Sequence, residues 1–180
     1  MGPIFLSPGQ GKDDRRERGA ERIPGRMKFF STLKADRCLT QLLSERDPAS
    51  PEGRKALESL RSIGPEAIPK VIEAFATADK EHGGAMVTLL ASLLDDKTFP
   101  LFSAGLAHTD KLCVAGVTKA LAISANYDTN RLTELLGKPE IFKPALIEIL
   151  GIVRKRLNAR ELLKRAYDLE PREKAAVFKI

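Results

Sequence analysis

The chain has 180 residues and a formal net charge of +6, with 43% hydrophobic and 30% charged residues. This composition is typical of one soluble globular domain and excludes a chain that is disordered throughout. No apolar run approaches the roughly 18 residues of a membrane-spanning helix, so the sequence predicts no membrane partner.

The net charge is distributed unevenly along the chain. Residues 1–26 hold six basic and four acidic residues, residues 27–153 hold 15 and 16, and residues 154–180 hold nine and four. The three segments therefore carry net charges of +2, −1 and +5. The overall basic charge is no argument for nucleic-acid binding, and only the C-terminal end can carry a basic patch.

The two cysteines, Cys38 and Cys113, are too far apart to indicate a disulfide framework or a zinc site. Each precedes an aliphatic residue on a predicted helix, which favours buried free thiols. Free thiols suit a reducing cytoplasm, and we expect a cytoplasmic protein.

Residues 1–26 differ from the rest of the chain. They contain five glycines, three prolines and a mixed-charge run, without a helical apolar stripe. We expect this N-terminal segment to be disordered. A different kind of sequence begins at Met27, so a natural start at Met27 and a genuine flexible arm remain two interpretations of the segment.

A first helix is predicted over residues 32–45. Nothing before it offers a partner helix, so we expect it to cap the N-terminal end of a stack. Ser50 is predicted to be the N-cap of the next helix and Pro51 its first residue. The apolar face of the capping helix consists of Leu33, Leu39, Leu42 and Leu43.

A helical pattern then occurs four times, over residues 66–79, 97–110, 127–140 and 158–171, at spacings of 31, 30 and 31 residues. Positions that correspond in the copies are apolar, and their i, i+3 and i+4 spacing places them on one helical stripe. The first column is Val71, Phe102, Leu132 and Leu163. The last column is Phe75, Leu106, Leu136 and Tyr167. The column between them, Ala74, Gly105, Leu135 and Ala166, is mostly small and suits a close helix crossing.

Each of these helices follows a partner helix, predicted over residues 51–63, 84–94, 110–124 and 143–157. The helix pairs cover residues 51–79, 83–110, 111–140 and 143–171. A pair of about 31 residues cannot bury its apolar face alone, and stacking against neighbouring pairs does so. An ordinary helix bundle with accidental periodicity is the alternative.

At this point the first copy resembles a known family. Its residues Ala56-Leu57, Ile63-Gly64-Pro65, Ala67-Ile68-Pro69, Val71-Ile72 and Ala74-Phe75 are similar to the bacterial, bilin-lyase-type HEAT-like repeat. The resemblance covers roughly residues 51–170 and weakens in the last two copies. It implies an all-α fold: a right-handed α-solenoid of about four HEAT-like helix pairs, with an N-terminal capping helix and a C-terminal partial repeat. The repeat domain would span residues 27–180.

Residues 172–180 begin a further helix without a partner. We expect that the chain is a fragment or one module of a longer repeat protein, and a capped or dimerising end is the alternative. Aspartates and an asparagine between the helices are predicted to act as helix caps. These are Asp79, Asp95 with Asp96, Asp110, Asp128 and Asn158.

No residue pattern indicates catalysis, a metal or a cofactor. The two histidines, His82 in a predicted loop and His108 at a predicted helix end, have no partner at metal-ligand spacing. No nucleophile elbow is present. We therefore expect that the protein is not an enzyme.

The leading hypothesis is a protein–protein interaction scaffold whose partner is another protein or a missing, regulated domain of the same chain. The second helix of each pair usually lines the concave face of such arrays. The candidate partner-binding residues on these helices are Lys70, Glu73, Arg131, Glu134, Lys164 and Arg165. The column Glu73, Ala104, Glu134 and Arg165 changes from acidic to basic, which fits a partner with a matching gradient. Solvated helix positions are the alternative.

The second hypothesis is nucleic-acid binding through the basic C-terminal repeat. Several cations near the end of the stack could neutralise phosphates, with an affinity that falls steeply with salt. The candidate basic patch consists of Arg154, Lys155, Arg156, Arg160 and Arg172, with Lys164 and Arg165 beside it.

Overall fold

The computed structural model describes the backbone of residues 24–180 and the side chains of residues 30–180. This part of the chain consists of helices and contains no β-strand, which confirms the predicted all-α class. The predicted disorder of residues 1–26 falls almost entirely outside the described residues. Its last three residues lie in the first turn of a helix.

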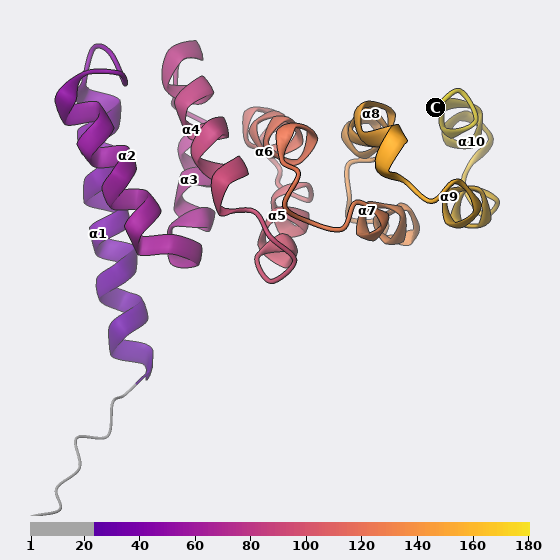
Figure 1. Cartoon of the computed structure of the whole chain (residues 1–180), viewed down its shortest axis with the longest axis horizontal. Helices are drawn as coiled ribbons and strands as arrows, with labels where there is room; N and C mark the ends of the chain where they lie inside the picture. The colour runs from indigo at the N-terminus through magenta and orange to yellow at the C-terminus, as the bar shows by residue number, and fades with distance from the viewer. Residues whose placement is uncertain (1–23) are drawn as a thin grey trace, which may run out of the picture.

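Successive helices pair and follow one another along the long axis of the molecule (Figure 1). In chain order the elements are α1 (Pro24–Ser44), α2 (Pro51–Ile63), η1 (Gly64–Ala67), α3 (Ile68–Ala74), α4 (Lys80–Leu93), α5 (Phe99–Gly105), α6 (Lys111–Ile123), α7 (Asn130–Glu134), η2 (Leu135–Gly137), α8 (Lys143–Val153), η3 (Arg154–Arg156), α9 (Ala159–Ala166) and α10 (Pro171–Val177).

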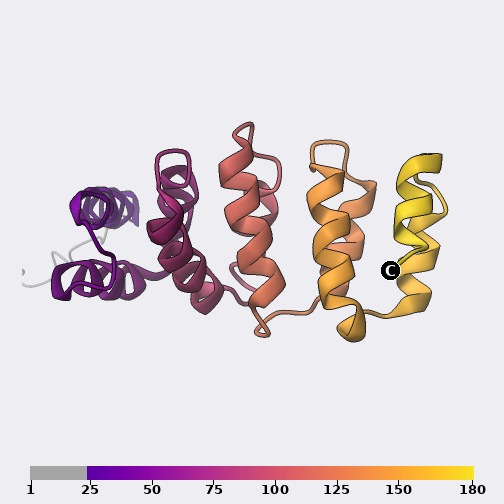
Figure 2. The ribbon, with the colours of Figure 1, turned by 90° about the horizontal axis from the view of Figure 1, so that it is seen from above.

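The helices form two rows. The even row consists of α2, α4, α6, α8 and α10, and the odd row of α1, α3, α5, α7 and α9. From α4 onward the even row lies above the odd row in Figure 1 and faces the viewer in Figure 2. Contacts link α4 to α6, α6 to α8 and α8 to α10 within the even row. In the odd row, α3 contacts α5 and α7 contacts α9. Each pair therefore packs mainly against the pairs next to it.

Polar side chains define where several helices begin. Ser50, Asp79, Asp110 and Asn158 each accept hydrogen bonds from backbone N–H groups in the first turn of the following helix. These bonds satisfy donors that lack partners within the helix. The predicted caps at these four positions are confirmed, as is the range of α2. Gly64, which follows α2, has a φ of 77°, a backbone conformation that favours glycine.

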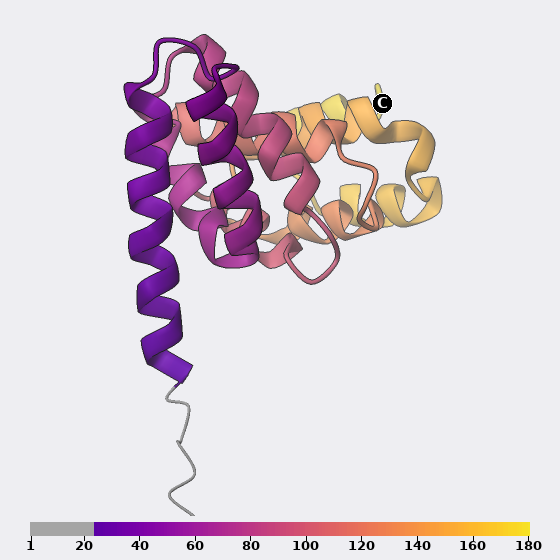
Figure 3. The same cartoon turned by 60° about the vertical axis from the view of Figure 1, so that its left-hand side comes forward.

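Other helix boundaries differ from the predictions. Helix α1 begins at Pro24, eight residues earlier than predicted, and extends beyond the end of α2 (Figure 3). Helix α4 begins at Lys80 instead of Gly84, because the Asp79 cap starts it ahead of the two glycines. The prediction that His82 lies in a loop is therefore wrong: it is a buried residue in the first turn of α4.

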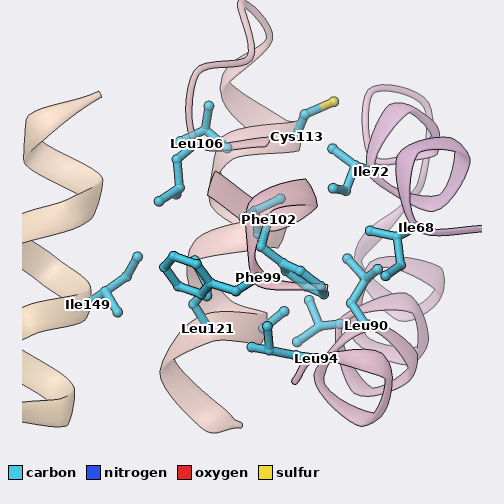
Figure 4. Close-up of a cluster of buried hydrophobic side chains, with 14 of the residues drawn as sticks. Ile68, Ile72, Leu90, Leu94, Phe99, Phe102, Leu106, Cys113, Leu121 and Ile149 are labelled. Atoms are coloured by element: carbon cyan, nitrogen blue, oxygen red, sulfur yellow. The ribbon is translucent and has the colours of Figure 1, made fainter. Parts of the chain in front are cut away.

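The core runs between the pairs. Figure 4 shows Phe102 of α5 among the side chains of α3, α4 and α6, including Ile68, Leu90 and Leu121. The small residue predicted at the helix crossing is required there. A Cβ on Gly105 would lie 2.7 Å from Val117 Cγ2 and 3.1 Å from Ile72 Cδ1. Glycine thus allows α5 to lie close to α3 and α6.

The predicted register is correct in three copies and wrong in the fourth. Val71, Phe102 and Leu132 are fully buried, but Leu163 is 49% exposed and its neighbour Leu162 is 7% exposed. At the last column, Tyr167 is 75% exposed and Ala166 is buried in its place. Adjacent residues of a helix point about 100° apart, and in α9 the core lies on the side of Leu162 and Ala166. The core positions of the third and fourth copies are therefore 30 residues apart.

The two leucines of α9 form a matched pair for a stability test. We expect Leu162→Ala to lower the free energy of unfolding by about 2–4 kcal/mol, because it leaves a cavity in the core. Leu163→Ala should change it by about 0.5 kcal/mol or less. Urea unfolding followed by circular dichroism measures both. A larger loss of unfolding free energy for Leu163→Ala than for Leu162→Ala would show that Leu163 is the core residue, as the spacing of 31 residues predicts.

Candidate functional site

The first two candidate residues of the odd row bind each other. Lys70 Nζ lies 3.0 Å from Glu73 Oε2 on α3 and 3.6 Å from Asp36 Oδ1 on α1. The hydrogen bond and charge of Glu73, helped by Asp36, raise the pKa of Lys70. These contacts join α1 to α3 and leave little of the lysine's charge for a partner. Exposed ion pairs of this kind contribute little stability.

Arg131 and Arg156 enclose two aromatic rings. The guanidinium Cζ of Arg131 lies 4.5 Å from the centre of the Phe99 ring, and that of Arg156 lies 5.8 Å from the centre of the Tyr127 ring. The two rings stack with their centres 5.6 Å apart and an interplanar angle of 23°. We call these four side chains the Arg–aromatic stack. Guanidinium groups are attracted to ring faces, which explains the order of the stack.

Each arginine of the stack also donates a hydrogen bond to the backbone of an earlier pair. Arg131 donates to the Asp96 carbonyl, and Arg156 Nη1 donates to the Ser124 carbonyl at 2.9 Å. The Tyr127 hydroxyl donates to the Leu121 carbonyl at 2.9 Å, and burial raises its pKa to about 12. The geometry therefore gives both arginines a structural role.

The remaining candidates of the odd row are exposed. Glu134, Lys164 and Arg165 project from α7 and α9 into solvent. The four residues of the predicted charge column, which includes Glu73 and Ala104, are all exposed. Their role in binding a partner remains a prediction.

The candidate basic patch is divided between two ends of the helices. Arg154, Lys155 and Arg160 are exposed at η3 and the start of α9, beyond the last residue of α8. Arg172 lies in the first turn of α10, next to Glu173, whose charge acts on Lys143 at the opposite end of α8. Helix α8 has 11 residues and is about 16 Å long. The structure therefore does not bring Arg172 to the other cations.

Two grooves flank α6 on the even row, and sequence reasoning did not find them. The α6–α8 groove has a volume of about 430 Å³, and the α4–α6 groove has a volume of about 510 Å³. Ala115 and Lys119, on the exposed side of α6, line both grooves. The grooves are thus neighbouring parts of one surface.

This surface is rich in apolar groups. Leu112 of α6 lines the α4–α6 groove and Phe142, just before α8, lines the α6–α8 groove, and each is at least half exposed. Ile123 of α6 and Ile152 of α8 are further exposed apolar residues on the same two helices. Small residues lie between them. A Cβ on Gly83 or Gly84 of α4 would have no heavy atom within 4 Å, so packing within the chain does not require glycine there. The sequence holds large apolar residues close to small ones here, such as Leu112 with Ala115 and Phe142 with Ala145, but it does not show which of them are exposed.

The described residues hold few other chemical features. No group of three or more His, Cys, Asp or Glu side chains among them could hold a metal ion. The thiols of Cys38 and Cys113 are free and buried, as predicted, and burial raises the pKa of Cys113. None of the helices described has the length and apolar character to cross a membrane. No protein-family model, curated protein or solved structure matches the chain.

The Arg–aromatic stack predicts that Arg131 supports the fold. Arg131→Ala removes a cation–π contact and a hydrogen bond to a carbonyl, so we expect the free energy of unfolding to fall by about 1–2 kcal/mol. Glu134→Ala on the same helix is the control and should change it by about 0.5 kcal/mol or less. Thermal and urea unfolding measure the difference. Equal losses of unfolding free energy in the two variants would contradict a structural role for Arg131.

Proposed function

We propose that this protein is a non-catalytic protein–protein interaction scaffold, built as a right-handed α-solenoid of HEAT-like helix pairs. The observation that carries the proposal is the apolar surface of the even row, with the two grooves beside α6. Exposed apolar patches rimmed by polar residues mark sites where proteins bind one another. Pairs that pack mainly against their neighbours leave long faces available for such contacts.

The position of the apolar surface differs from the position expected from the sequence. The candidate partner-binding residues lie on the odd row, where Lys70, Glu73 and Arg131 contact other parts of the chain. On the even row, Leu112 and Ile152 project from two successive helices. We therefore assign the contact surface to the even row, and the exposed Glu134, Lys164 and Arg165 of the odd row are the competing surface.

Affinity purification with quantitative mass spectrometry tests the scaffold. The tagged chain is exposed to a nuclease-treated lysate of the source cells, in parallel with Leu112→Ser/Ile152→Ser and a control, Glu134→Ser/Lys164→Ser. Specific protein partners should be recovered by the wild type and the control, and recovery should fall at least about fivefold with the even-row variant, because apolar contacts dominate interfaces.

Two outcomes would contradict this assignment. Recovery of no specific protein by the wild type would contradict the scaffold itself. Partners that are lost with the odd-row variant and retained by the even-row variant would move the contact surface to the odd row. Circular dichroism checks that each variant is folded; the substituted residues are exposed, so we expect melting temperatures close to that of the wild type.

Nucleic-acid binding is the second candidate, supported by the exposed cations Arg154, Lys155 and Arg160 at one edge of the stack. With Arg156 in the Arg–aromatic stack and Arg172 elsewhere, about three phosphate contacts remain. We expect weak binding to random-sequence DNA or RNA, with a log–log salt slope near −3. A fluorescence anisotropy titration measures it. Submicromolar affinity at about 150 mM salt that Arg154→Glu/Lys155→Glu abolishes would favour this function over the scaffold.

A further inference from the structure

We propose that the α6–α8 groove binds an amphipathic helix of a partner protein, one that carries carboxylates along the edges of its apolar face. This inference rests on the proposed scaffold function and names the site and the chemistry of its partner. It follows from the shape of the groove, the hydrogen bonds that the polar groups of its walls already form and the charges at its rim.

The shape of the groove suits a helix. It lies between α6 and α8, which are side by side in the even row (Figure 2). Ala115 on α6 and Ala145 on α8 both line it, and such small side chains allow a third helix to approach closely. Helices that pack together lie about 8–10 Å apart, with the shorter distances at small residues. Phe142 lies at the start of α8 and is half-exposed. Its backbone N–H donates to the Leu106 carbonyl at 3.2 Å, which holds this wall in place.

The walls favour a helix over an extended segment. An extended segment needs backbone partners for its own N–H and C=O groups. Eight of the eleven lining residues belong to α6 or α8, and the wall formed by Val114, Ala115, Thr118 and Lys119 lies beyond the first turn of α6, where backbone groups bond within the helix. The Thr118 hydroxyl, which also lines the groove, donates to the Val114 carbonyl at 2.8 Å. A bound helix forms the hydrogen bonds of its backbone N–H and C=O groups internally, so only its side chains need partners in the groove.

The rim of the groove selects for negative charge. Lys111 and Lys119 line it from α6 and are exposed, and neither forms an ion pair with any residue that the structure describes. Eight residues apart on one helix, they are separated by about 12 Å along its axis, or just over two turns of a bound helix. His108 Nδ1 accepts the Asp110 N–H, so its remaining proton is on Nε2 as a further donor. Glu148 is the single carboxylate residue in the lining.

The neighbouring groove has the same sign of charge. Lys80 and Lys119 line the α4–α6 groove with one acid, Asp79. The Asp79 carboxylate already accepts bonds from two backbone N–H groups of α4 and lies 2.8 Å from His82 Nδ1. These hydrogen bonds, chiefly with His82, lower the pKa of Asp79 and keep the carboxylate turned to the helix end. Lysines that form no ion pair with a described residue thus lie on both sides of α6, where they complement an acidic partner.

Selection from a display library tests the proposal without a known partner. Random peptides of about 16 residues, long enough for over four helical turns, are selected on the full chain at low salt. The same library is selected on Lys111→Glu/Lys119→Glu, in which only exposed lysines change, and on Ala115→Trp, which fills the groove. Affinities of enriched peptides are then measured by fluorescence anisotropy.

We expect the wild type to enrich acidic peptides with apolar residues three and four positions apart. Their affinity should fall at least tenfold for both variants and should weaken as salt is added. The charge-reversed variant should enrich basic peptides instead. Enrichment of basic or neutral peptides by the wild type would overturn the proposal, as would unchanged affinity for Lys111→Glu/Lys119→Glu. No enrichment by the wild type over Ala115→Trp would overturn it as well.

The peptide library tests the groove and the lysate experiment tests the scaffold function, so failure of one can be told from failure of the other. If the wild type recovers specific proteins from the lysate and Lys111→Glu/Lys119→Glu recovers them equally well, the scaffold stands and the groove is not its site. If acidic helical peptides bind the groove and the lysate yields no partner, the groove stands and the proposed function fails.

Discussion

The burial of apolar side chains between successive helix pairs is the contact on which this structure depends. A single pair of short helices has too little core of its own: α3, α5, α7 and α9 contain 7, 7, 5 and 8 residues. Short helices are marginal in isolation and gain their stability from packing. Phe102 illustrates the arrangement, because it is fully buried among side chains from its own pair and from the pair before it.

Local chemistry made much of the fold predictable. A side chain that caps a helix acts on N–H groups two or three residues away, so Ser50, Asp79 and Asp110 could be recognised from the sequence. The core columns were recognisable in the first three copies, where the first and last columns of the predicted stripe are buried. In α9 two leucines are adjacent, and periodicity alone could not decide which faces the core. The contact with neighbouring elements decided it in favour of Leu162.

The roles of the charged residues were less predictable, because they depend on contacts between pairs. Arg131 is 32 residues from Phe99, and Arg156 is 29 residues from Tyr127, so no local pattern connects an arginine with its ring. A sequence shows that an arginine lies on a polar helix face but not whether an aromatic ring of the preceding pair lies beneath it. The candidate site of the odd row therefore contains both structural residues and exposed ones.

Lys70 and Arg131 of the odd row differ from Lys111 and Lys119 of the even row in their partners, and this difference supports the even row as the binding surface. On the odd row Lys70 and Arg131 have acidic, carbonyl or aromatic partners within the chain. On the even row Lys111 and Lys119 form no ion pair with a described residue and lie beside apolar groups. Glycine in a helix interior is less favourable than alanine by about 1 kcal/mol. Gly84 carries that cost in α4 where a methyl group would meet nothing in the chain, which is consistent with a close approach by another molecule.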